Sequence, residues 1–165
     1  MYPIAVCGDI RQFFNQVVLD VQDQRYHRFL WRDGNPSKPV QVYQWLRVLF
    51  GNKSSPDMAT YALRYLANKY ELKFPRGAAK LKDNTYVDDV GYSENDTDSA
   101  IEVRNETDEV LQEGRFEIKV WNSNSPAVDQ NPLESQVEFL GHNWDKINDL
   151  IQVKWNACTI PDPAS

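Results

Sequence analysis

The sequence predicts an α+β fold in which an antiparallel sheet carries helices on one face. Three observations support this class. Strand patterns recur as neighbouring pairs joined by short turns, and long helical repeats stand between those pairs instead of alternating with single strands. The order is strand, hairpin, helix, hairpin, helix, strand, hairpin. At 165 residues and 41% hydrophobic, the chain is one domain with enough material for a core.

The first quarter of the chain predicts a buried strand and a hairpin. Residues 4–7 are uniformly apolar and end at Gly8 and Asp9. Residues 10–19 contain Phe13 and Phe14, which indicates a turn of helix or a bend packed on the sheet. Residues 26–31 and 40–46 alternate as strands on either side of the turn-forming residues 34–37.

Two helices are predicted from spacing and end signals. The first begins at Ser54, with Pro56 in its first turn, and its apolar positions repeat to about residue 71. The second begins within residues 95–99, which offer several N-caps, among them Ser99 in what resembles a capping box with Glu102, and it ends at Gly114. Residues 73–82 are basic and polar and are expected to be a connector.

The remaining elements are strands. Residues 85–92 predict a hairpin with Asp88 and Asp89 at its tip. Residues 116–121 alternate as a strand. Residues 137–144 and 150–155 predict two more strands paired around Asn148 and Asp149, and residues 156–165 are expected to be a tail.

Bulk composition limits the function classes. The net charge of -6 argues against a stand-alone nucleic-acid binder, because phosphate contacts need Lys and Arg. Cys7 and Cys158 form no disulfide framework or metal knuckle, and no signal peptide or transmembrane run is visible, which indicates an intracellular location. Because the chain opens almost directly on a buried strand, we expect it to be a fragment of a longer polypeptide.

Three carboxylates form the candidate chemical site. Asp9 ends the first strand, and Asp88 and Asp89 stand at the tip of a later hairpin. If these strands are neighbours, the acids converge at one edge of the sheet. Carboxylates that lie close together repel one another. Mg²⁺ is a suitable counter-ion for them, because it prefers hard oxygen ligands. For Asp88 and Asp89 alone, a polar turn is the alternative.

Together with three other segments, the regions around these acids resemble the reverse transcriptases. Five segments lie in the family's order: Asp9-Ile10 with Phe13-Phe14, then Phe50-Gly51 with Ser54-Ser55-Pro56, Tyr86-Val87-Asp88-Asp89, Gly114-Arg115-Phe116-Glu117-Ile118-Lys119, and Phe139-Leu140-Gly141. Residues 29–33 and 121–124 look most like LTR retrotransposons of the BEL/Pao type.

The resemblance implies a right-hand polymerase palm of ferredoxin-like fold with part of the fingers. It divides the chain into palm with the first catalytic motif (1–24), a fingers hairpin segment (25–50), the remaining palm motifs (51–155) and a tail (156–165). It implies Asp9, Asp88 and Asp89 as catalytic residues. The same three acids and the Ile10 carbonyl would be ligands of two Mg²⁺ or Mn²⁺ ions.

Further roles follow from the same resemblance. Phe13, Phe14, Phe50 and Gly51 are assigned to nucleotide binding. The bulk of Phe14 would exclude a ribose 2′-OH, and a core aromatic or a tight turn is the alternative at these positions. Lys119 is a candidate general acid, although Val120 holds the family's usual lysine position. Because one place in a regular strand reverses the face, a solvated lysine is the alternative there.

The implied activity is RNA-directed DNA polymerisation from dNTP onto a primer 3′-OH. The implied partners are an RNA or DNA template-primer, dNTP, and the fingers, thumb and RNase H segments of the same polyprotein, in the cytoplasm or a retroelement particle. Without those segments, this fragment is expected to be inactive alone. The alternative is a co-opted or decayed fragment that acts as a non-catalytic interaction module.

Overall fold

A four-stranded antiparallel sheet lies at the centre of the molecule. The computed structural model describes residues 2–154 of the 165. The sheet has the order β4-β5-β1-β6, with bounds β1 Ile4–Ile10, β4 Thr85–Tyr86, β5 Asp89–Glu94 and β6 Ile118–Ser123. The first strand of the chain therefore lies between two strands that are formed more than 75 residues later, and the predicted antiparallel sheet is confirmed.

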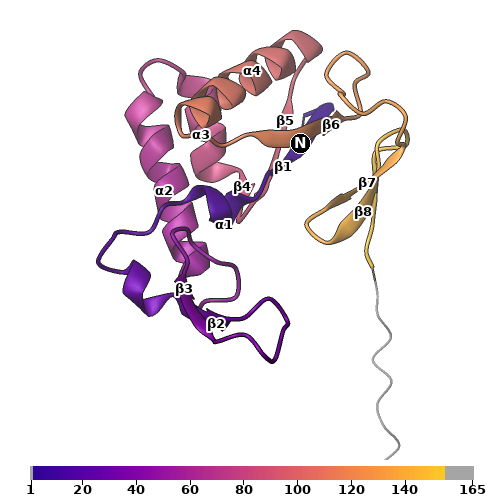
Figure 1. The fold of residues 1–165 in the computed structure, drawn as a ribbon. Helices are drawn as coiled ribbons and strands as arrows, with labels where there is room; N and C mark the ends of the chain where they lie inside the picture. The colour runs from indigo at the N-terminus through magenta and orange to yellow at the C-terminus, as the bar shows by residue number, and fades with distance from the viewer. Residues whose placement is uncertain (1, 155–165) are drawn as a thin grey trace, which may run out of the picture.

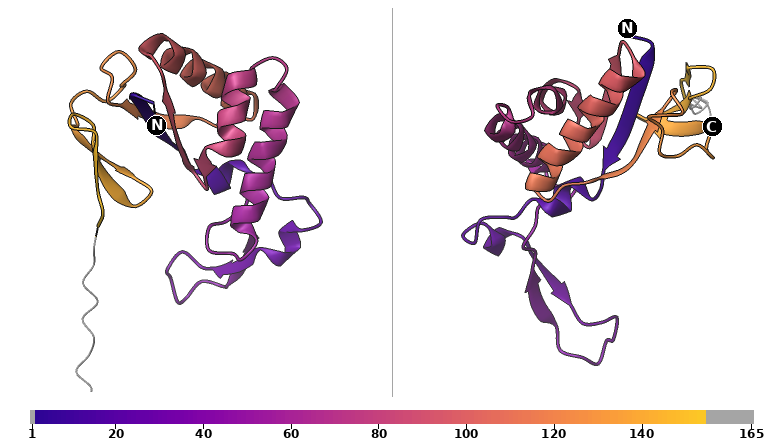
Figure 2. Two further views of the ribbon diagram at one scale, coloured as in Figure 1. Left: turned by 180° about the vertical axis from the view of Figure 1, so that it is seen from behind. Right: turned by 90° about the horizontal axis from the view of Figure 1, so that it is seen from above.

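Three helices cover one face of this sheet. They are α2 (Ser55–Tyr70), α3 (Pro75–Asp83) and α4 (Thr97–Glu113). The view from above in Figure 2 shows them together on one side of β1, with the C-terminal strands on the other side. The α+β class with helices on one face, predicted from the sequence, is confirmed by this arrangement.

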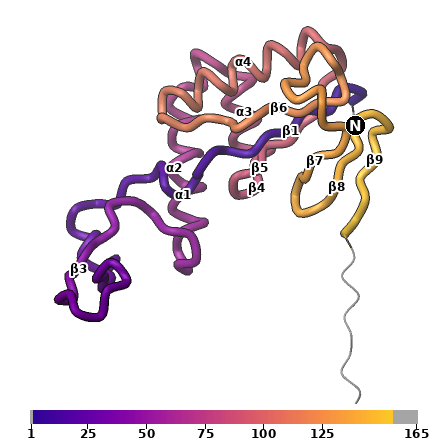
Figure 3. The backbone as a smooth tube through the Cα atoms, turned by 45° about the vertical axis from the view of Figure 1, so that its right-hand side comes forward, coloured from indigo at the N-terminus to yellow at the C-terminus, as the bar shows by residue number. Residues whose placement is uncertain are grey.

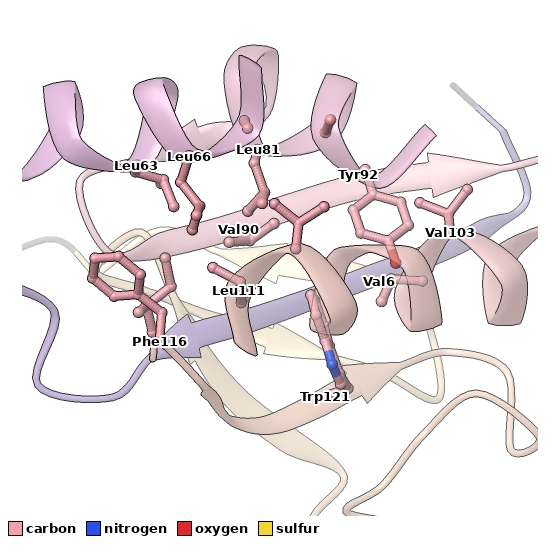
Figure 4. Packing of buried hydrophobic residues seen from close by; sticks show 14 of the residues in the cluster. Val6, Leu63, Leu66, Leu81, Val90, Tyr92, Val103, Leu111, Phe116 and Trp121 are labelled. Carbon is pink, nitrogen blue, oxygen red and sulfur yellow. The ribbon is translucent and has the colours of Figure 1, made fainter. Parts of the chain in front are cut away.

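The main core lies between the sheet and the helices. Strand β1 contributes alternate residues, Val6 and Ile10, which are buried against this layer. Trp121 of β6 is 1% exposed, and its indole Nε1 donates to Asp108 Oδ1 of α4 at 2.9 Å. Figure 4 shows Val6 and Trp121 converging with apolar side chains from α2, α3 and α4: Leu63, Leu66, Leu81, Val103 and Leu111.

A second, smaller sheet packs against the opposite face. It consists of β7 (Gln136–Phe139), β8 (His142–Asp145) and β9 (Leu150–Gln152), in that order. Val137 and Trp144 from this sheet bury Cys7 of β1, and Phe139 packs on the same cluster. Figure 3 shows β7, β8 and β9 beside the central strands. The odd positions of β1 therefore face this sheet, whereas the even positions face the helices.

A two-stranded hairpin extends away from both layers. Helix α1 (Phe13–Gln16) and the 3-10 turn η1 (Gln24–Tyr26) lead from β1 to β2 (Arg28–Trp31), which pairs with β3 (Gln41–Gln44). Figure 1 shows this hairpin below α2, apart from the four-stranded sheet. Every residue of both strands is exposed. Among residues 2–154, no helix has the length and apolar character needed to span a bilayer.

Residues 73–82, expected to be a connector, instead contribute most of helix α3. The residue before this helix, Phe74, provides no side-chain cap. The cap comes from α4, where Glu106 Oε2 accepts hydrogen bonds from the backbone N–H groups of Arg76 and Gly77 at 2.8 and 2.9 Å. A carboxylate at a helix N-terminus satisfies its free donors and complements its dipole. Because this cap lies thirty residues away in sequence, local patterns could not indicate it.

One other local prediction was wrong, and one that the sequence left open is decided by the structure. Residues 137–144 do not form one strand: Leu140 and Gly141 both adopt positive φ values, 51° and 75°, and reverse the chain between β7 and β8. Of the several N-caps that residues 95–99 offer, helix α4 uses Asp96, whose side chain accepts from Ser99 N at 2.8 Å. The predicted strand to residue 155 and the tail at 156–165 extend outside the described residues.

Candidate active site

Asp9 and Asp89 lie directly opposite each other on neighbouring strands. In the β1/β5 register Asp9 is the partner of Asp89, at the last residue pair of that ladder. The backbones of directly opposed residues in an antiparallel pair are within about 4.5–5.5 Å of each other. Both positions belong to the face that carries β7–β9, because Ile10 and Val90 point into the helical core. The two strands are therefore neighbours, which is the condition on which the expected convergence of the acids depended.

Asp88 sits in the tight turn between β4 and β5. Its preceding residue, Val87, has φ of 56°, which is unusual for a β-branched side chain. The Asp88 carbonyl accepts a hydrogen bond from Ile10 N at 2.8 Å, which ties this turn to the end of β1. The three acids therefore meet at one end of the sheet, with Asp9 and Asp89 in the ladder and Asp88 beside them.

Asp89 is partly buried beside other carboxylates, and this raises its pKa. Its pKa is raised first by burial and then by the neighbouring Asp88, with smaller contributions from Asp9 and Glu138. One hydrogen bond opposes this shift: Leu140 N, in the turn between β7 and β8, donates to Asp89 Oδ2 at 3.3 Å. The turn of the second sheet therefore stabilises the charged form of Asp89 through a backbone N–H group.

A β-bulge brings Lys119 to the same place. Between Gly8 and Ile10 the β1/β6 register shifts, so that Asp9 faces both Lys119 and Val120. Lys119 Nζ lies 2.7 Å from Asp9 Oδ1, and both side chains are partly exposed. The sequence argument that one position reverses the face assumed a regular strand. The bulge removes that objection, because the extra residue restores Lys119 to the carboxylate face.

The aromatic residues assigned to nucleotide binding lie in different environments. Phe13 is 2% exposed, and its ring packs on those of Phe14 and Phe116. Phe14 is only partly buried and retains accessible surface. Phe50 is 75% exposed, and Gly51 has φ of 88° in the loop before α2. Phe13 therefore supports the site from within the core, and Phe14 and Phe50 are the accessible aromatics.

A cavity of about 240 Å³ opens between β1, β6 and β7 beside the acids. Its lining includes Asp9, Asp89, Lys119, Asn122 and Glu138. Cys7 also lines it, but burial raises the pKa of that thiol to about 12, with Asp89 adding to the shift. A thiol with that pKa is protonated at neutral pH, which excludes Cys7 as a nucleophile.

The contribution of the second sheet could not be seen in the sequence. Phe139 packs over Gly91, where a side chain would begin only 2.2 Å from the Phe139 ring. This close approach positions the adjacent Leu140 N–H on Asp89. The one available signal was Gly91 itself, because a glycine within a strand often marks a close approach of another group.

The donor set suits a divalent cation, although its present arrangement does not form a cage. Among residues 2–154, no three His, Cys, Asp or Glu side chains lie close enough together to hold a metal ion. The hard carboxylate oxygens and the unbalanced charge at Asp89 nevertheless fit Mg²⁺ chemistry. Asp9 Oδ1 accepts no well-directed hydrogen bond, and its counter-ion is the Lys119 ammonium. An ion held by Asp9 and Asp89 would therefore have to displace Lys119.

Comparison with known protein families agrees with this geometry. Residues 1–144 match the family model described as reverse transcriptase (RNA-dependent DNA polymerase). No curated protein matches the chain. The family match covers most of the 165 residues and includes every acid of the site. The chain therefore belongs to the reverse transcriptase family.

Proposed function

We propose that this chain is the palm of an RNA-directed DNA polymerase that joins a dNTP to a primer 3′-OH. The observation that carries the proposal is the opposition of Asp9 and Asp89 at the end of the β1/β5 ladder, with Asp88 in the adjoining turn. A template-primer of RNA or DNA is the partner that this reaction requires. Descent from a BEL/Pao-type element and an intracellular location are part of the same proposal.

The acids of this chain would bind and orient the reacting groups. Asp9, Asp88 and Asp89, with the Ile10 carbonyl, would hold two Mg²⁺ ions. Such a pair supplies charge stabilisation to the attacking and leaving oxygens of an in-line displacement. The bulk of Phe14, which packs on Phe13 and is partly exposed, would exclude a ribose 2′-OH. The Lys119 ammonium lies on the carboxylate face and could donate a proton to the departing pyrophosphate.

A non-catalytic interaction module is the second candidate. The specific observation in its favour is the Asp9–Lys119 ion pair, which balances Asp9 without a metal. In such a co-opted or decayed fragment, the palm fold would be retained for interaction with a partner and not for catalysis. The two candidates differ in one measurable property, which is whether a divalent cation replaces Lys119 at Asp9.

Primer extension under enzyme excess tests the proposed reaction. With an RNA template, we expect no useful extension by this chain alone, whereas a longer chain that adds fingers and thumb segments should extend the primer and lose that activity in Asp89→Asn. Synthesis by the palm alone is not expected, because correct orientation of duplex and triphosphate contributes about 7–11 kcal/mol of barrier reduction and the palm supplies only part of it. Absence of product from the longer chain as well, or equal product from its Asp89→Asn variant, would transfer support to the non-catalytic module.

Replacing Lys119 should strengthen binding of a divalent cation. In Lys119→Met the ammonium no longer neutralises Asp9 at 2.7 Å, so we expect Mn²⁺ to bind severalfold more tightly, as measured by water-proton relaxation. Lys38→Met is a matched control, because Lys38 pairs with Asp33 at 2.9 Å and is similarly exposed. Equal Mn²⁺ affinity in the two variants would show that the ion does not compete with Lys119.

A further inference from the structure

Helix α2 carries a second apolar stripe, which faces solvent. One side of the helix packs into the main core through buried apolar side chains: Ala59, Leu63, Leu66 and Ala67. The opposite side carries residues at alternate spacings of three and four positions, the last of them in the turn after the helix: Met58, Tyr61, Tyr65, Asn68 and Leu72. Tyr61 and Tyr65 are 72% and 63% exposed, and Leu72 is fully exposed.

The spacing of this outer stripe is that of a coiled-coil seam. Residues that alternate three and four positions apart keep to one narrow side of a helix, where they pack between the side chains of a second helix. A helix with apolar side chains on both sides is expected to be buried on both. In Figure 1, α2 forms the left edge of the helical layer, with α3 and α4 to its right. The outer stripe is therefore accessible to a second helix.

The charges beside the stripe identify that helix as α2 of a second copy, running antiparallel. Arg64 and Glu71 lie seven positions apart, on the same flank of the stripe. A two-fold pair brings this flank against itself, so that residue i contacts j and j contacts i. When Tyr65 packs beside Asn68 of the second copy, each Arg64 comes next to a Glu71. Within its own chain Glu71 uses only Oε1, which accepts from Lys82 Nζ at 2.8 Å.

The same charges disfavour the other arrangements of two such helices. Shifting the antiparallel pair by one heptad would place Arg64 against Arg64 and Asp57 against Glu71. A parallel pair would place Arg64 beside Lys69 of the second copy, because flanking positions five residues apart meet in that orientation. Like charges opposed in this way suppress the pairing. The antiparallel register with Arg64 next to Glu71 is the one that matches opposite charges.

We propose that the outer stripe of α2 is a self-association surface through which two copies of this chain form a two-fold, antiparallel contact. Asn68 fixes the register at a cost in stability, as a single polar residue in a seam does. The inference is independent of the proposed polymerase chemistry, because the stripe shares no residue with the acid site. One short helix pair buries less than the about 1,200 Å² of a standard interface, so we expect a weak dimer with a Kd on the order of 100 µM.

Sedimentation equilibrium of the full chain in EDTA tests this contact without metal, nucleic acid or dNTP. We expect a monomer–dimer equilibrium in the wild type. Arg64→Glu should weaken it about tenfold, because a carboxylate then meets Glu71 of the second copy. The charge exchange Arg64→Glu/Glu71→Arg should restore most of the affinity, which a general loss of stability would not do. Arg28→Glu, the same change of charge on the exposed strand β2, is the matched control and should pair as the wild type does.

Substitutions within the stripe give a second test. Tyr61→Ser/Tyr65→Ser should abolish pairing, and Asn68→Leu should tighten it, because leucine removes the polar group from the seam. Trp31→Ser/Trp45→Ser on the hairpin is the control, since these rings are also exposed, at 52% and 42%, and lie outside the stripe. A wild type that stays monomeric up to about 1 mM would overturn the proposal. So would a dimer that only the hairpin variant abolishes, or a charge exchange that fails to restore pairing.

Discussion

Breaking the ion pair between Lys146 and Asp129 should cost about 3–5 kcal/mol of folding free energy, because it leaves a buried charge without its partner. The two side chains are 5% and 7% exposed, and Lys146 Nζ lies 2.8 Å from Asp129 Oδ2. The same ammonium donates to the carbonyl of Asn131 at 2.7 Å. Because Lys146 follows β8 and Asp129 follows β6, the pair fastens the second sheet to the first.

Urea unfolding of Lys146→Met and Asp129→Leu measures this effect. Each single variant should be destabilised by the stated amount, whereas the double variant should recover much of the loss, because two apolar side chains replace two paired charges. Lys38→Met is the control, since the exposed Lys38–Asp33 pair should contribute no more than about 1 kcal/mol. Single variants no less stable than this control would show that the pair does not fasten the sheets.

Regular patterns in the sequence were sufficient to predict the sheet and two of the helices. The bounds of α2, Ser55–Tyr70, agree with the repeat that begins at Ser54. One acid at a strand end and two at a hairpin tip predicted convergence at one edge if the strands were neighbours, and the pairing of Asp9 with Asp89 meets that condition. These predictions succeeded because alternation and helical spacing are local properties that burial on one face imposes directly.

The elements that could not be predicted depend on partners far away in the sequence. Helix α3 receives its cap from Glu106, and the ion pair of Lys146 joins residues 17 positions apart without any recurring pattern. Lys119 faces Asp9 only because β6 contains one extra residue opposite β1. In each case the decisive contact forms between elements after they pack, so neither spacing nor propensity contains it.

The acid site illustrates the same division. The residue types at Asp9, Asp88 and Asp89 indicate a cation site, but the sequence contains no sign that an ammonium group would already neutralise one of them. The pKa of Asp89 is then raised by burial and by the neighbouring charge of Asp88, and both depend on the folded arrangement. The chemistry of the donors can be read from the chain, whereas their state of charge is a property of the folded molecule.

Adding one methyl group at Gly91 should disturb both the packing of the second sheet and the acid site. A Cβ atom there would lie 2.2 Å from Phe139 Cζ, and that ring is fixed among Ala5, Cys7 and Trp144. Overpacking of this kind typically costs about 1–3 kcal/mol. The displaced strand also carries Leu140, whose N–H group donates to Asp89.

Gly91→Ala should therefore lower the free energy of unfolding by that amount and raise the pKa of Asp89 further, because the hydrogen bond from Leu140 is what opposes the present upward shift. Urea unfolding measures the first effect, and an NMR titration of the Asp89 carboxyl carbon measures the second. Phe139→Leu in the Gly91→Ala background is the matched test: the shorter side chain makes room for the added methyl group, so stability should partly return. If Gly91→Ala left both quantities unchanged, Phe139 would not be the contact that holds the second sheet against the acid site.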